Sequence, residues 1–157
     1  MKLFQTQMIL AAMSLAAAPL SAQVPAAPPA AAPAPPPVLT PAQEARFLQL
    51  GKTYTRWFLA GKADSLAGVY ETTALLRMGG VENIRQQMAQ VADHAGTESA
   101  VLAEKMTRRN GWPQFWHEGQ FTQFADEPIV IRWVMDADGH IVGVGLGPKS
   151  RTPAVDN

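Results

Sequence analysis

The sequence predicts an α+β roll, in which N-terminal helices pack on a curved antiparallel sheet of about four to five strands. Three observations predict this fold. Apolar residues recur at helical spacing in the first part of the domain. From Glu98 onward the period changes to that of strands. Near the end, residues 129–147 read IVIRWVMDADGHIVGVGLG, two apolar runs joined by the turn-forming sequence DADG. The chain therefore ends in an antiparallel hairpin that follows helical sequence.

Residues 1–22 predict a secretory signal peptide. Lys2 supplies a positive start, residues 8–20 are apolar, and Ala22 offers a small residue at the cleavage position. The apolar run is short and contains Pro19, so it is a poor membrane span. An uncleaved N-terminal anchor is the alternative. We expect an exported protein, periplasmic or extracellular, without a stable membrane span after cleavage.

Residues 23–39 consist almost entirely of Ala and Pro. Proline fixes φ and removes hydrogen-bond donors, so neither helix nor sheet propagates there, and no core can form. This segment predicts a disordered spacer. A functional interpretation is that it holds the domain away from a surface, but a disordered leader is the simpler one and we prefer it.

The composition excludes several classes of function. The chain of 157 residues has no cysteine, which excludes disulfides, a thiolate nucleophile and a cysteine-rich zinc site. Thirteen acidic and thirteen basic residues balance, and no basic stripe occurs, so nucleic acid is not an expected partner. The histidines His94, His117 and His140 have no metal-ligand spacing. We therefore expect neither a metal nor a cofactor.

The folded domain is expected at residues 40–148, with a loose tail at 149–157. A first helix begins with Thr40, Pro41 and Gln43, the pattern of a capping box, and ends near Gly61. A second helix is predicted at 63–69, capped by Asp64 or Ser65. A third is predicted at 81–94, after the break at Gly79-Gly80. Residues 70–78 fit either a short strand or a helical turn.

Four strands are predicted after the helices. They cover residues 99–108, 112–124, 129–135 and 140–146. Asn110-Gly111 is the expected turn between the first two, and Gly119 marks an expected bulge in the second.

These segments resemble the nuclear transport factor 2-like superfamily, also called cystatin-like or ketosteroid isomerase-like. The likeness rests on the sequence RWFLAGK at the end of the first helix, the Gly79-Gly80 helix, and the closing strands with WVMD and GHIVG. More narrowly, the chain is similar to a secreted branch often found beside serine-hydrolase domains. The resemblance implies a sheet that wraps around a long helix and leaves an apolar pocket. It also implies homodimers through the outer face of the sheet. Some members are isomerases, cyclases or dehydratases, and others only bind.

His117 is the strongest candidate for a site residue. On an unbulged strand it shares a face with Phe115 and Phe121, where it could act as a general base or orient a ligand. A hydrogen-bonded histidine in the core or at its rim is the interpretation that we prefer. Glu104 and Glu118 are the acids on the strands, and both are expected to face outward, so a buried carboxylate base is missing.

Two further motifs have simpler interpretations than a functional one. The sequence DADG at residues 136–139 lacks the remaining ligands of a calcium loop, so it is expected to be only a turn. Trp112 and Trp116 are expected to be partly exposed, where they could support a dimer interface or merely cap the core.

The sequence therefore predicts a secreted, non-catalytic binding or accessory domain. Its expected partners are a small apolar ligand, a second copy of the chain or an envelope protein. No residue is expected to be catalytic. The alternative is an isomerase, dehydratase or cyclase that uses His117 and Tyr54. The predicted pocket lining is Tyr54, Tyr70, Met88, His117 and Trp133.

Overall fold

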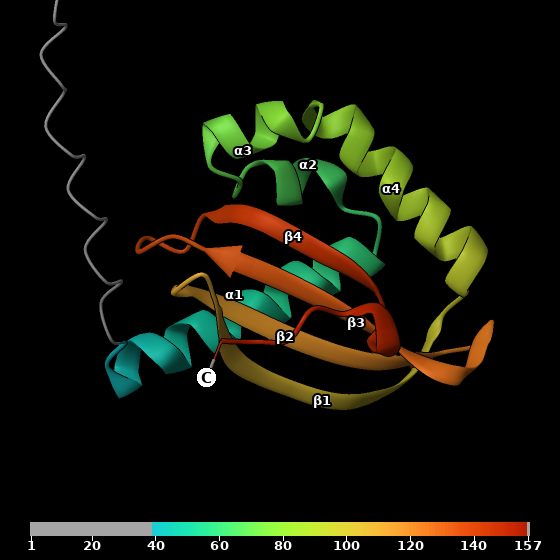
Figure 1. Ribbon diagram of the computed structural model, residues 1–157. Helices are drawn as coiled ribbons and strands as arrows, with labels where there is room; N and C mark the ends of the chain where they lie inside the picture. The colour runs from blue at the N-terminus through green and yellow to red at the C-terminus, as the bar shows by residue number, and fades with distance from the viewer. Residues whose placement is uncertain (1–38, 157) are drawn as a thin grey trace, which may run out of the picture. The chain divides into compact units, whose positions relative to one another are not determined.

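The computed structural model describes residues 39–156, which form four α-helices and one four-stranded sheet (Figure 1). The predicted α+β class is confirmed. The helices are α1 (Pro41–Leu59), α2 (Ala63–Ala67), α3 (Thr72–Arg77) and α4 (Gly80–Ala95). The strands are β1 (Glu98–Arg109), β2 (Trp112–Phe121), β3 (Phe124–Met135) and β4 (Ile141–Pro148). The predicted signal peptide (1–22) and residues 23–38 of the predicted spacer lie outside the described residues.

The strands form an antiparallel meander in the order β1-β2-β3-β4. Asn110 and Gly111 join β1 to β2, as predicted, and both have positive φ, 50° and 78°. Positive φ at both central residues is the geometry of a type I′ hairpin turn. The strand predicted for residues 112–124 ends early, at Phe121, because two turn residues follow it and β3 begins at Phe124.

Helix α1 lies across one face of the sheet, which we call the inner face (Figure 1). Tyr54 and Phe58 of α1 meet Trp133 of β3 edge-on, with ring centroids 6.4 and 5.8 Å apart. A Cβ atom on Gly51 would overlap the ring of Phe115, so this glycine lets the helix approach β2 closely. The core is thus built between α1 and the inner face, and α2, α3 and α4 extend it on one side.

The helix caps agree with the sequence at α1 and differ at α2. The hydroxyl of Thr40 accepts from the N–H of Gln43, and the Gln43 side chain accepts from the N–H of Thr40, which confirms the capping box. At α2 the prediction of Asp64 or Ser65 as cap is wrong. Lys62 occupies the N-cap position, and its side chain makes no capping hydrogen bond.

Residues 70–78, which the sequence leaves open between a short strand and a helical turn, form a short helix after one isolated bridge. Tyr70 forms an isolated bridge with the start of β4, and α3 follows at once. The carboxylate of Glu71 caps α3 by accepting from two backbone N–H groups. Gly79 adopts φ 82° and precedes α4, so the expected break is confirmed.

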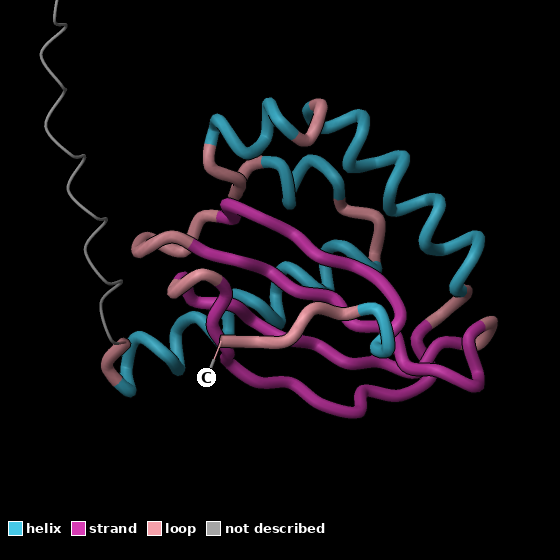
Figure 2. Tube along the Cα trace, viewed as in Figure 1, coloured by secondary structure: helices cyan, strands magenta, loops and turns pink. Residues whose placement is uncertain are grey.

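Residues 149–156, which we call the C-terminal strap, differ from the expected loose tail. They begin with a 3-10 helix, Lys149–Arg151, and end with an isolated bridge between Asp156 and Arg108. Figure 2 shows the strap running in front of the sheet, on the side away from α1. The strap therefore crosses part of the face opposite α1, where Trp112 is still 46% exposed. None of the helices between residues 39 and 156 combines the length and apolar character that crossing a membrane requires.

Candidate functional site

His117 lies on β2, and its side chain is on the inner face of the sheet beneath α1. It is paired with Ile131 on β3 and with Glu104 on β1. Only 2% of its side chain is exposed. The ring lies beside Phe115, 6.5 Å between centroids, as the shared parity of the two residues predicts. A polar ring is thus buried in an aromatic layer, where both of its nitrogens need partners.

Two carboxylates of β1 supply those partners. Nε2 of His117 lies 2.5 Å from Oε1 of Glu98, and Nδ1 lies 3.2 Å from Oε1 of Glu104. Nζ of Lys52, from α1, lies 2.8 Å from the second oxygen of Glu104. The four side chains form a chain of alternating charge that links β1, β2 and α1, and we call it the His117 cluster.

Irregular pairing in β1 brings Glu98 to this position. Glu98 and Glu104 are six residues apart, but their partners on β2, Phe121 and His117, are four apart. Register shifts between Glu98 and Ala100, and between Val101 and Ala103, account for the two extra residues. Such bulges bend a strand and redirect its side chains. They draw the carboxylate of Glu98 toward the ring of His117.

Gly119 makes room for that carboxylate. A Cβ atom at Gly119 would lie 3.1 Å from Cδ of Glu98, which is closer than ordinary packing allows. The pairing of β2 with β3 also shifts between Gly119 and Phe121, which confirms the bulge expected there.

The His117 cluster forms the floor of an open groove of about 390 Å³. The groove lies between the second half of α1 and strands β1 and β2. Arg56 and Lys52 stand on its helical side. Its remaining lining residues are Thr55, Leu59, Ala60, Glu98, Val101, Glu104 and His117. Leu59 and Val101 are 37% and 54% exposed, so the groove has an apolar rim above a charged floor.

The cluster favours a protonated histidine. Burial alone would lower the pKa of His117, but hydrogen bonds and negative charge from Glu98 and Glu104 outweigh it and raise the pKa above its ordinary value of 6.5. Burial opposes ionisation of Glu104 as well, yet Lys52 and His117 hold the pKa of that carboxyl below its ordinary value of 4.5. An imidazolium donates from both ring nitrogens, and each carboxylate accepts one of these bonds.

The structure separates the five residues predicted to line one pocket. His117 borders the groove. Tyr54, Tyr70, Met88 and Trp133 instead belong to the buried apolar core. The hydroxyl of Tyr54 donates to the carbonyl oxygen of Gly139 at 2.9 Å, so it makes no hydrogen bond to His117. Burial raises the pKa of Tyr54, and it raises the pKa of Tyr70 to about 12, so both stay neutral.

The expectation that Glu104 faces outward is wrong, and Glu98 is a site residue that the sequence does not predict. The sequence does contain a signal for the position of Glu104. Arg109 and Trp112 flank a two-residue turn, and counting back from that pair places Glu104 directly opposite His117, on the same face. Glu98 could not be found in this way, because its position depends on the two bulges. Glu118, by contrast, lies on the outer face as expected and pairs with Lys149.

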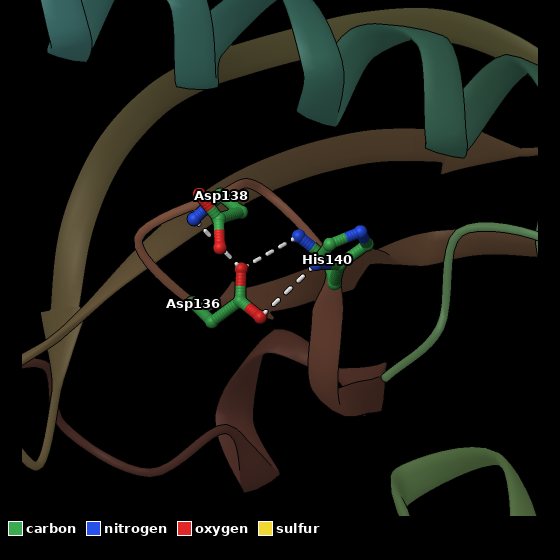
Figure 3. Close-up of side chains that lie close together, drawn as sticks. All are labelled: Asp136, Asp138 and His140. Carbon is green, nitrogen blue, oxygen red and sulfur yellow. Dashed lines mark hydrogen bonds and ion pairs between the residues drawn. The ribbon is translucent and has the colours of Figure 1, made fainter. Parts of the chain in front are cut away.

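A second group of polar side chains lies at the turn between β3 and β4 (Figure 3). Asp136, Asp138 and His140 each have an oxygen or nitrogen atom that could bind a metal ion, and these atoms lie within 4.8 Å of one another. Oδ1 of Asp136 accepts from the backbone N–H groups of Asp138 and His140, at 2.9 and 2.8 Å. Its other oxygen lies 3.2 Å from Nδ1 of His140. The carboxylate of Asp136 therefore stabilises the hairpin turn that the sequence predicts.

A second groove, of about 410 Å³, lies between α4 and the ends of β3 and β4. Gln87 and Val91 line it from the helix, and Phe124 and Leu146 line it from the sheet. It contains no ion pair among the described residues.

Comparison with known proteins finds no family model, no curated protein and no solved structure that matches this chain.

Proposed function

We propose that this chain is an exported, non-catalytic binding domain that holds a small molecule in the groove above the His117 cluster. One observation carries the proposal: both ring nitrogens of His117 are engaged by carboxylates, on the floor of a groove that is open at the rim. A general base needs a free lone pair on one ring nitrogen. A histidine bound on both sides instead holds β1 against β2 and fixes the floor of a binding site.

The groove suits an amphiphilic ligand with a carboxylate head. Lys52 and Arg56 carry two positive charges, and His117 adds a third when it is protonated, against the carboxylates of Glu98 and Glu104, so the lining then has a net charge of +1. Arg56 is exposed and makes no ion pair among the described residues. Its guanidinium is a bidentate partner for a carboxylate. Leu59 and Val101 offer apolar surface to the rest of the ligand.

Binding of decanoate tests the proposal, with decylamine as the probe of equal length and opposite charge. Calorimetric titration of the full-length chain should give binding of decanoate and weaker binding of decylamine. Arg56→Gln should weaken decanoate binding roughly tenfold, the loss expected for one charge-assisted hydrogen bond.

Gln87→Glu is the matched control. It makes the same change in charge in the second groove, and it should leave the affinity for decanoate unchanged. The reverse result, an effect of Gln87→Glu and none of Arg56→Gln, would place the ligand between α4 and β4. No binding of either probe to the unaltered chain would count against an amphiphile site in both grooves.

An enzyme is the second candidate, and one observation favours it. A histidine paired with a carboxylate at 2.5 Å beside an open groove is also the arrangement of general acid–base catalysis. The two candidates differ in what His117→Ala does. If the cluster is structural, the substitution leaves Glu98 without its partner and Glu104 with Lys52 alone, and it lowers the melting temperature strongly. If His117 transfers protons, it abolishes turnover and leaves the melting temperature nearly unchanged.

The resemblance to the nuclear transport factor 2-like superfamily supports a binding role, and it adds a homodimer or an envelope protein as partner. Size-exclusion chromatography with light scattering tests the dimer. A strict monomer over the accessible concentration range would remove that part of the proposal and leave the groove untouched.

A further inference from the structure

The outer face of the sheet, opposite α1, has an unusual row of side chains across its middle. Lys105, Trp116, Arg132 and Gly145 occupy successive strands and are paired in register from β1 to β4. Nζ of Lys105 lies 5.3 Å from the centre of the Trp116 ring. A Cβ atom at Gly145 would lie 2.8 Å from Cζ of Arg132, so the guanidinium occupies the space that the glycine leaves open.

The C-terminal strap crosses this face and is fastened at its two ends (Figure 2). At the first end, Nζ of Lys149 lies 2.7 Å from Oε1 of Glu118, and the N–H of Ser150 donates to Glu127 at 2.8 Å. At the other end, Oδ2 of Asp156 accepts from the N–H of Gly111 at 2.9 Å. An acidic residue at the end of an extended segment thus anchors the strap on the hairpin between β1 and β2.

The strap makes no hydrogen bond to several polar atoms of this face. Three buried side-chain atoms have no hydrogen-bond partner among the described residues, and all three belong to this face: Oε1 of Gln114, Nε1 of Trp116 and Nε of Arg132. The side chains of Gln114 and Trp116 are themselves buried, with 1% and 8% of each residue exposed. Buried polar atoms almost always have partners, so a group of three that lack them indicates a surface that can bind more than the strap supplies.

The charge of the face defines what it can bind. Lys105, Arg109 and Arg132 lie on it, and none of them forms an ion pair within residues 39–156. Burial and the charge of Arg109 both lower the pKa of Arg132. Glu118 on this face is already paired with Lys149, and Glu127 beside the start of the strap accepts from the N–H of Ser150. Three cations beside two unpaired N–H donors call for an anionic partner rich in acceptors.

We propose that the outer face of the sheet is a docking surface for an extended acidic peptide segment of a partner protein, and that the C-terminal strap occupies it in the absence of that partner. An extended backbone supplies carbonyl acceptors for Trp116 and Arg132 and an N–H donor for Gln114. Acidic side chains pair with Lys105, Arg109 and Arg132. The glycines of β4, Gly143, Gly145 and Gly147, present no side chain that would keep the peptide from the sheet. This surface is independent of the groove above the His117 cluster.

The test uses the full-length chain and a fluorescein-labelled peptide of alternating Glu and Ala. A peptide of alternating Lys and Ala is the control for charge. Asp156→Ala removes the side-chain anchor of the strap, so this variant should bind the acidic peptide more tightly than the unaltered chain in fluorescence anisotropy. Adding Arg132→Gln to this variant should weaken its binding of the acidic peptide roughly tenfold. Adding Arg77→Gln, an equal change of charge on α3, should leave it intact.

A spectroscopic readout keeps the test valid if Arg132→Gln lowers stability. Addition of the acidic peptide to Asp156→Ala should shift the indole N–H resonance of Trp116 and leave that of Trp133, which is bonded within the core, in place. Equal binding of the two peptides, or no effect of Arg132→Gln, would overturn the proposal. So would self-association of Asp156→Ala into a dimer that does not bind the peptide, because a second copy would then be the occupant.

Discussion

Oε1 of Glu98 lies 2.5 Å from Nε2 of His117, although the two residues belong to different strands and β1 must bulge twice to bring them together. With Glu104 on the other ring nitrogen, the two carboxylates raise the pKa of His117 and favour the charged ring. A protonated histidine with both nitrogens bonded holds strands together and shapes a groove. It has no lone pair with which to accept a proton from a substrate.

The first prediction concerns stability and pH. The pKa of His117 is raised in the folded chain above 6.5, the value expected when the chain is unfolded. The contribution of His117 to stability is therefore complete below pH 6.5 and is lost as the pH rises through the folded pKa. In that window the free energy of unfolding should fall by up to about 1.4 kcal/mol per pH unit. Urea unfolding measured across the window checks this.

His117→Gln is the control for that experiment, because it removes the titrating group and should flatten the same window. The contribution of Glu104 to stability depends on pH in the opposite direction. The pKa of its carboxyl is lowered, so its contribution is present above 4.5 and is lost as the pH falls through the folded pKa. A stability that rises with pH above 6.5 in the unaltered chain, and not in His117→Gln, would contradict a charged His117.

The second prediction tests the carboxylates themselves. Glu98→Gln and Glu104→Gln each remove one negative charge beside the imidazolium, so each should lower the pKa of His117. A titration followed by NMR of the imidazole ring measures the change. Glu118→Gln, an equal change on the outer face of the same sheet, should leave this pKa in place.

The third prediction concerns the close approach of α1 to β2. Gly51→Ala places a methyl group inside the ring of Phe115, and the helix must shift to accept it. The gain in helix propensity, about 1 kcal/mol, is smaller than the cost of overpacking, about 1–3 kcal/mol and sometimes more. Thermal unfolding should therefore show a lower melting temperature.

Gly68→Ala is the matched control for this substitution. Gly68 ends α2 with φ −66°, and a Cβ there meets its nearest neighbours at an ordinary 3.6 Å. It should be neutral or stabilise by about 0.4–1 kcal/mol. Equal losses in the two variants would mean that α1 does not pack on Phe115 as described.

The fourth prediction concerns a hydrogen bond within the core. The indole N–H of Trp133 donates to Oγ1 of Thr55 at 2.9 Å, and both side chains are buried. Thr55→Val keeps the shape of the side chain but leaves the indole donor unpaired, at a cost of about 1–3 kcal/mol. Thr53→Val makes the same change two residues earlier in α1, where the hydroxyl makes no hydrogen bond among the described residues, and its effect on urea unfolding should be small.

Local signals in the sequence predict much of the fold because each acts within a few residues. The capping box at Thr40 and the turn at Asn110-Gly111 both form as expected. The same turn fixes the register that places Glu104 opposite His117. The bulges that bring Glu98 to the ring have no such local cause, since they depend on how β1 bends around α1.

The placement of four of the predicted pocket residues in the core has a related reason. Periodicity identifies Tyr54, Met88 and Trp133 as inward-facing, but it does not distinguish a residue packed in a core from one that lines a cavity. That difference depends on how closely the helices approach the sheet. The order of residues 149–156 likewise depends on distant partners, Glu118 and Gly111, which a reading of the tail alone does not reveal.

The protonation state of His117 at pH 6.5 is the most direct test of the central claim. NMR of the ¹⁵N-labelled imidazole in the full-length chain should show a ring that is more than half protonated at pH 6.5, because its pKa is raised above that value. A mostly neutral ring at pH 6.5, with one nitrogen carrying no proton, would contradict the account, because His117 would then have the lone pair of a general base.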